Sequence, residues 1–134
     1  KPGSPAPDIR FVNVEGIEFG LKDLEQDTLV LVFWASWCPH CQEEMPKINS
    51  WAGTRANLKV IGISLDTELK EYQNSIKEYP ELLHYCDFQK WNSPVVNNYF
   101  IAATPTFIML DEGRNIIGKY SNFKALSQQE PPKL

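Results

Sequence analysis

The sequence predicts an α/β fold in which a central sheet of mixed strand direction has helices on both faces. Three observations support this class. Short apolar runs alternate along the chain with stretches that begin at helix caps or end at prolines, as strands alternate with helices. Residues 28–34, Thr-Leu-Val-Leu-Val-Phe-Trp, are almost continuously apolar, which is typical of a central strand covered on both faces. The last two apolar runs flank Asp111-Glu112-Gly113, which predicts a terminal hairpin.

The first third of the chain leads into this central strand. Residues 1–8 contain three prolines and a glycine and predict an extended lead-in. Alternation over residues 9–14, a turn at Glu15-Gly16 and an apolar return over residues 17–19 predict a β-hairpin. One helical turn is expected within residues 21–26, followed by the strand over residues 28–34.

The remaining elements follow the same alternation. A helix is expected from Pro39 to about Ala52, since proline is tolerated in the first turn. A buried strand over residues 58–65 precedes a helix capped by Asp66 or Thr67 and ending near Tyr79. The sequence then predicts a strand over residues 82–86, a short helix over 93–98, strands over 106–110 and 115–120, and at most one short helix within 122–134.

The composition fits one ordinary domain over residues 1–134, with a lead-in at 1–8 and a tail at 122–134. The chain is 43% hydrophobic and carries a net charge of −4, so it has a core to bury and no basic face for nucleic acid. It has no apolar run long enough to span a membrane. Because it begins at Lys1, we expect a processed chain or a module of a longer protein.

Two of the three cysteines, Cys38 and Cys41, form a Cys-x-x-Cys motif that follows the central strand and opens a helix. Unpaired N–H groups and the positive end of the helix dipole favour a thiolate there. In such settings the pKa of a cysteine falls from about 8.5 to roughly 3.5–7.5. We therefore predict a catalytic dithiol in which Cys38 is the nucleophile and the less exposed Cys41 resolves the mixed disulfide.

The two residues between the cysteines tune this chemistry. Pro39 lacks an N–H group and stiffens the turn, and the side chain of His40 could donate to the Cys38 sulfur or lie beside it as a cation. Stabilising the thiolate stabilises the reduced form and raises the reduction potential. The Pro-His pair therefore favours a more oxidising couple than an uncharged pair would.

A structural zinc site is the main alternative for this motif. Such a site needs four ligands, usually in two clusters. The remaining candidates, Cys86, His84 and His40, form no second cluster with suitable spacing, so we expect no metal and no cofactor other than a redox-active Cys38–Cys41 disulfide. We interpret Cys86 as a small buried hydrophobe, with a regulatory role as the less favoured reading.

The segment over residues 33–41, FWASWCPHC, resembles the active-site signature of thioredoxins. Further segments resemble the TlpA/ResA-like branch: EEMP at 43–46, ATPT at 103–106, PAPD at 5–8, LKDL at 21–24 and DEG at 111–113. The resemblance covers about residues 3–120. It implies a thioredoxin fold with an added N-terminal β-hairpin and a βα insertion before a cis-proline loop.

The resemblance also implies roles for individual residues. Thr104-Pro105 matches the cis-proline loop, which would place the Thr104 backbone beside Cys38, ready to pair with a substrate strand. Trp37 would form part of the rim around the disulfide. Glu44 matches a buried glutamate, whose raised pKa would let it exchange a proton with Cys41; a solvated helix glutamate is an equal alternative. Val32 stands where classical thioredoxins carry a buried aspartate.

Three functions compete. The favoured one is thiol–disulfide exchange with extracytoplasmic proteins, because members of the branch are usually periplasmic or membrane-tethered, with a membrane-bound or periplasmic electron donor. The branch mostly reduces disulfides, whereas Pro39-His40 favours an oxidant. A peroxiredoxin-type peroxidase would need Thr-x-x-Cys, and Ser36 does not stand in the matching place. A thioredoxin-like adaptor within a larger protein is the third. We expect a monomer.

Overall fold

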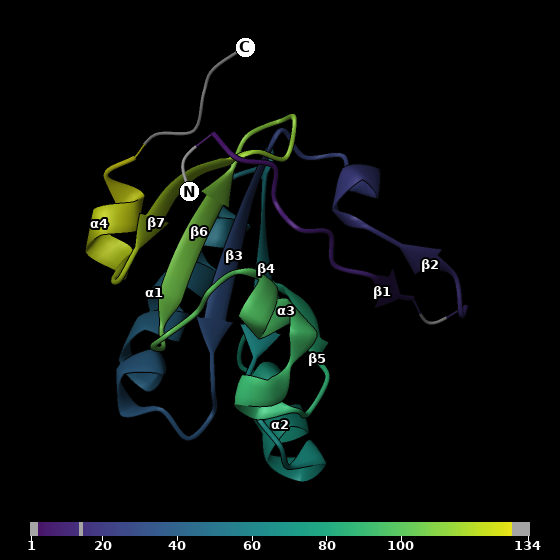
Figure 1. Ribbon diagram of the computed structural model, residues 1–134. Helices are drawn as coiled ribbons and strands as arrows, with labels where there is room; N and C mark the ends of the chain where they lie inside the picture. Colours follow the sequence, from purple (N-terminus) through teal and green to yellow (C-terminus); the bar gives the residue numbers. More distant parts are fainter. Residues whose placement is uncertain (1–2, 14, 130–134) are drawn as a thin grey trace.

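The sheet is built around β3 (Thr28–Trp34), whose seven side chains are all buried. A computed structural model describes residues 3–13 and 15–129 (Figure 1). The strand β3 pairs in parallel with β4 (Leu58–Ser64) and antiparallel with β6 (Thr106–Leu110). Two outer strands, β5 (Leu83–Cys86) and β7 (Ile116–Tyr120), complete the order β5-β4-β3-β6-β7. The predicted mixed sheet is confirmed.

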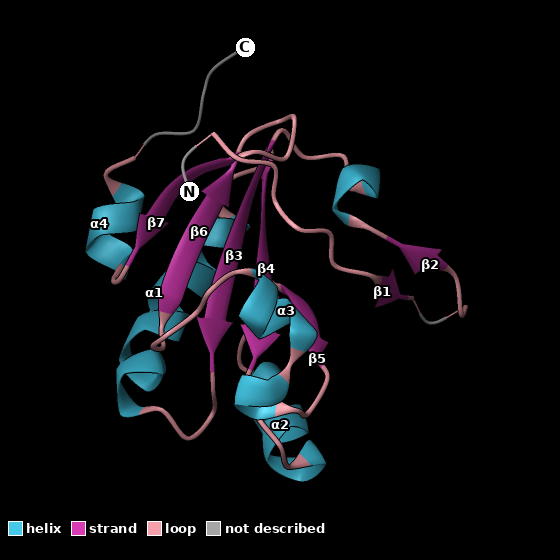
Figure 2. Cartoon of the chain, viewed as in Figure 1, coloured by secondary structure: helices cyan, strands magenta, loops and turns pink. Residues whose placement is uncertain are grey.

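Helices cover both faces of this sheet (Figure 2). On one face, α1 (Pro39–Gly53) connects β3 to β4 and packs against β4 and α4 (Phe123–Ser127), and α2 (Leu69–Ile76) connects β4 to β5. The short helix α3 (Pro94–Asn98) belongs to the other face, because Tyr99 at its end contacts Phe33, whose side chain points opposite to that of Trp34. The predicted two-sided cover is confirmed.

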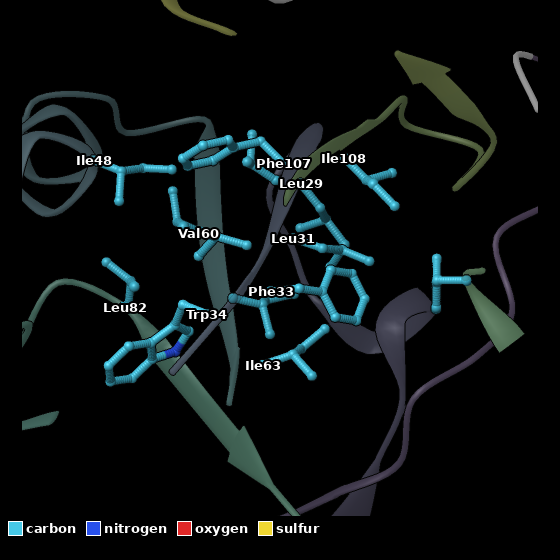
Figure 3. Close-up of a cluster of buried hydrophobic side chains, with 14 of the residues drawn as sticks. Leu29, Leu31, Phe33, Trp34, Ile48, Val60, Ile63, Leu82, Phe107 and Ile108 are labelled. Carbon is cyan, nitrogen blue, oxygen red and sulfur yellow. The ribbon is translucent and has the colours of Figure 1, made fainter. Parts of the chain in front are cut away.

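The core consists of two apolar layers separated by the sheet (Figure 3). Residues alternate along β3, so one layer holds Trp34 and the other holds Leu31 and Phe33. The register of β3 with β4 places Val60 opposite Val30 and Ile63 opposite Phe33, which sorts the β4 side chains into the same two layers. The buried layers fix the C-terminal ends of β3 and β4, where the cysteines follow.

The N-terminal hairpin is shorter than the sequence predicts. Its strands β1 (Phe11–Val12) and β2 (Glu18–Phe19) form a separate two-stranded antiparallel sheet. The predicted strand over residues 9–14 was too long, because the Asn13 side chain accepts hydrogen bonds from the backbone N–H groups of Glu15 and Ile17 and starts the turn early. The end of that prediction, residue 14, lies outside the described residues. The following turn, η1, covers Leu21–Asp23.

The start of α2 is the second correction. Glu68 occupies the N-cap position without a side-chain cap bond, and the helix ends at Ile76, three residues before the predicted Tyr79. Asp66 does not cap it because its carboxylate accepts hydrogen bonds from Ser36 and Ser64.

A short 3₁₀ turn, η2 (Lys90–Asn92), was not predicted. The other described elements begin and end within about two residues of their predicted bounds, and residues 130–134 of the predicted tail lie outside the described part.

Candidate active site

Cys38 occupies the N-cap position of α1, as the sequence predicts. Its Sγ accepts a hydrogen bond from the backbone N–H of Cys41 at 3.2 Å, and Pro39 fills the first helical position. Burial of Cys38 raises the pKa of its thiol, but hydrogen bonds from the Cys41 and Thr104 side chains and from the backbone N–H groups of Cys41 and His40 outweigh it. The pKa of Cys38 is therefore lowered.

Cys41 lies one turn inside the helix and is fully buried. Burial raises the pKa of its thiol to about 12, and its hydrogen bond to Cys38 acts in the same direction. The two thiols thus differ in acidity in the sense that the sequence predicts. The arrangement therefore holds one thiol that ionises more readily than an ordinary cysteine and, beside it, one thiol that stays protonated at neutral pH.

The cis-proline loop closes over Cys38 from the start of β6. The Thr104-Pro105 peptide bond is cis, as the resemblance implies. The Thr104 hydroxyl donates to the Cys38 Sγ at 3.4 Å, and the Thr104 carbonyl oxygen lies 3.7 Å from the same sulfur. The expected position of the Thr104 backbone beside Cys38 is therefore confirmed, and the hydroxyl adds a donor that sequence reasoning did not include.

The side chain of His40 is not placed at the sulfur. The His40 side chain is 72% exposed, and its imidazole Nε2 lies 4.0 Å from a carboxylate oxygen of Glu43. The group of His40 that contacts Cys38 is its backbone N–H. The thiolate is thus stabilised at this residue by the helix backbone, which any residue other than proline would supply.

Glu44 requires a correction. It is 6% exposed, so the expected burial is confirmed. Its pKa, however, is lowered: burial raises it, but the Lys47 ammonium at 2.9 Å and the backbone N–H of Phe123 at 2.7 Å outweigh that effect. The raised pKa expected from the resemblance was wrong, because Lys47, one turn further along α1, and the Phe123 N–H of α4 together outweigh the effect of burial. The carboxylate joins α1 to the first turn of α4.

Asp66 is a buried group near the site that sequence reasoning missed. It is 1% exposed, and its carboxylate accepts hydrogen bonds of 2.5 Å from both the Ser36 and the Ser64 hydroxyls and further bonds from the Ser36 backbone N–H. Ser36 lies two residues before Cys38, so Asp66 ties the active-site loop to the end of β4. A signal existed, since residues just beyond adjacent parallel strands meet at the same edge of a sheet.

The other candidates for a metal site lie apart from the dithiol. The His84 Nε2–H donates to the Tyr79 carbonyl oxygen at 2.8 Å, and the Cys86 Sγ lies 3.4 Å from the Asp66 carbonyl oxygen. Burial lowers the pKa of His84 and raises that of Cys86. Within residues 3–13 and 15–129, no three His, Cys, Asp or Glu side chains are grouped so that they could hold a metal ion.

Solved structures share this architecture. A thiol-disulfide oxidoreductase from Bacteroides fragilis matches with a TM-score of 0.77 and 27% identity, covering 93% of this chain and 96% of that one. The thioredoxin domain of a Bacteroides vulgatus thiol-disulfide oxidoreductase matches with a TM-score of 0.77 and 22% identity, over 96% and 94% of the two chains. The fold and the Cys-x-x-Cys helix start define a thioredoxin-like thiol–disulfide oxidoreductase, as predicted.

Sequence comparison agrees with that class. The chain belongs to the AhpC/TSA family, whose model matches residues 2–131. A curated relative, thiol-disulfide oxidoreductase ResA of Bacillus cereus, is 28% identical over 130 residues, which cover 96% of this chain and 74% of that protein. The TlpA/ResA-like resemblance is confirmed.

Proposed function

We propose that this protein reduces disulfides in extracytoplasmic proteins, with Cys38 as the attacking and Cys41 as the resolving thiol. The observation that carries the proposal is the difference between the two thiols. Hydrogen bonds lower the pKa of Cys38, whereas burial raises that of Cys41 to about 12. Two-step disulfide reduction needs an attacking thiol that ionises readily and a neighbouring thiol that stays protonated until it resolves the mixed disulfide.

In the first step the Cys38 thiolate attacks one sulfur of the substrate disulfide. A Cys38–substrate mixed disulfide forms, and the other substrate sulfur leaves as a thiolate. Cys41 then gives its proton to the substrate thiolate released first or to solvent, and its own thiolate attacks the Cys38 sulfur, which releases the second substrate sulfur as a thiolate and forms the Cys38–Cys41 disulfide. The substrate gains two electrons and the dithiol loses two. A membrane-bound or periplasmic dithiol donor would return the protein to the reduced state.

Substrate binding is proposed for the rim of the site. Trp37 is 45% exposed next to Cys38, and Thr104 holds its backbone beside the sulfur. A substrate strand that pairs with the Thr104 backbone would bring its disulfide to Cys38.

The reducing direction is part of the proposal. Pro39-His40 would favour an oxidant only with the imidazole at the Cys38 sulfur, and the imidazole lies in solvent near Glu43. Without that cation, the resemblance to reductants is the stronger guide. We also propose an extracytoplasmic location and a monomeric state. No described helix, within residues 3–13 and 15–129, has the length and apolarity needed to cross a bilayer.

The test is insulin reduction with wild type, Cys38→Ser and Cys41→Ser, together with the Cys38–Cys41 potential measured against a glutathione series. We expect turnover by wild type, none by Cys38→Ser, and a trapped mixed disulfide with Cys41→Ser. A potential near that of thioredoxin, about −270 mV, supports a reductant, and one near −120 mV contradicts it. Consumption of peroxide that depends on Cys38, with no insulin reduction, would assign a peroxidase instead. No turnover in either assay would leave an adaptor module.

A further inference from the structure

Besides the cis-proline loop, the segment between β5 and β6 reaches the rim of the dithiol through the side chain of Lys90. The Lys90 ammonium lies over the Trp37 ring, 5.0 Å from its centroid. Trp37 directly precedes Cys38 in the chain and is exposed. A cation from a distant segment thus lies on the aromatic ring of the residue that precedes the attacking cysteine.

The loop that carries Lys90 is held in a costly backbone conformation. Phe88 and Lys90 both have positive φ angles, 61° and 52°, in the left-handed region that residues other than glycine, asparagine and aspartate rarely occupy. The Asp87 carboxylate braces the loop by accepting from the Gln89 backbone N–H at 3.1 Å and from the Ser93 hydroxyl at 2.6 Å. Backbone strain that surrounding contacts maintain at the rim of a site indicates a functional role for the residue held there, which is Lys90.

No residue that the structure describes forms a salt bridge with Lys90. Among the described residues, no carboxylate forms an ion pair with its ammonium, and the carboxylate oxygens of nearby Asp87 are engaged by its own loop. The chain as a whole is acidic, with a net charge of −4, so the cation on the Trp37 ring is opposite in sign to the net charge of the molecule. The ring holds one side of the ammonium, which leaves N–H donors directed to solvent.

We propose that Lys90 and Trp37 together select protein substrates that carry an acidic side chain next to the reactive cysteine. The proposal rests on the proposed disulfide reduction. The indole gives the substrate segment a flat apolar surface, and the ammonium receives the carboxylate. The attraction acts before bond exchange, so it raises the second-order rate of reduction.

The experiment uses two peptide disulfides that differ only in having Glu or Lys beside one cysteine. Pre-reduced protein is mixed with each peptide, and the second-order rate is divided by the rate of that peptide with dithiothreitol, which removes intrinsic differences in reactivity. An exposed ion pair predicts that wild type prefers the Glu peptide by about two- to fivefold. Lys90→Met, which keeps the unbranched stem, brings the ratio near one, and Lys90→Glu inverts it. About 0.5 M salt brings the wild-type ratio toward one as well.

The matched control is Lys22→Glu. Lys22 is an exposed lysine in η1, which precedes β3, whereas the dithiol follows the other end of that strand. The change in net charge equals that of Lys90→Glu, so an unchanged Glu preference shows that the effect is local. Equal ratios in wild type and Lys90→Met would overturn the selection proposal while leaving disulfide reduction intact. If wild type reduces neither peptide faster than Cys38→Ser does, the proposed function itself fails.

Discussion

Replacing Glu44 by Gln tests whether this buried carboxylate stabilises the fold or serves the dithiol. The charged acceptor binds the Phe123 N–H at 2.7 Å, and such a bond contributes about 1.5–3 kcal/mol, against about 0.5–1.5 kcal/mol for the neutral amide that replaces it. The Lys47 partner is 57% exposed, so losing that pair adds only about 0.3–0.5 kcal/mol. We expect Glu44→Gln to lower the free energy of unfolding by about 1–2 kcal/mol at pH 7 in urea titrations.

The same variant has a defined pH dependence. Because the pKa of Glu44 is lowered in the folded protein, its stabilisation is fully present above the ordinary carboxyl pKa and is lost as the pH falls through the folded value. The stability difference between wild type and Glu44→Gln should therefore shrink in acid. Glu43→Gln, at a neighbouring side chain that is 73% exposed, is the control and should change stability by no more than about 0.5 kcal/mol.

The cysteine pKa values of Glu44→Gln decide whether Glu44 acts on the dithiol. Glu44 is bonded to Lys47 and Phe123, so ultraviolet titration of thiolate absorbance should give the same cysteine pKa values in wild type and Glu44→Gln. A clear shift of the Cys41 titration with unchanged stability would show that Glu44 exchanges protons with the dithiol, and our structural interpretation would be wrong.

Three further outcomes are expected. Iodoacetamide should modify Cys38 at pH values where an ordinary thiol is unreactive and should spare Cys41, as mapped by mass spectrometry; equal pH profiles would contradict the assigned asymmetry. Asp66→Asn should cost about 2–3 kcal/mol in urea unfolding, because an amide N–H₂ would face the Ser36 backbone N–H; an unchanged midpoint would refute the tether. Arg114→Lys should be about 2 kcal/mol less stable than wild type, because one ammonium cannot replace a guanidinium that donates to five backbone carbonyls; full stability of the variant would contradict this.

The parts of the structure that sequence predicted well depend on local signals. The bounds of β3 follow from a continuous apolar run, and Cys38 at the N-cap follows from a strand that ends just before a Cys-Pro pair. Each signal lies within a few residues of the feature it predicts. The hairpin was less well predicted because the Asn13 side chain competes with strand pairing, and this turn chemistry is not visible in the alternation of apolar residues.

The features that sequence missed depend on groups far apart in the chain. The Phe123 N–H, which helps Lys47 to lower the pKa of Glu44, lies 79 residues away, and the tether by Asp66 requires Ser36, 30 residues away. Neither partner has a motif of its own. Only the docking of α4 on α1, and the shared edge of β3 and β4, bring these pairs together.

The groups that tune the Cys38 thiolate likewise include local ones, which the sequence predicts, and a distant one, which it does not. The dipeptide between the cysteines invited an argument from the His40 side chain, but the donors at the Cys38 sulfur are two backbone N–H groups, the Cys41 thiol and the Thr104 hydroxyl. The backbone donors belong to any helix that starts at Cys38, whatever side chain stands at position 40. The side-chain contribution specific to this chain therefore comes from the cis-proline loop, 66 residues away, so Thr104 is a better place than His40 to alter the stability of the thiolate.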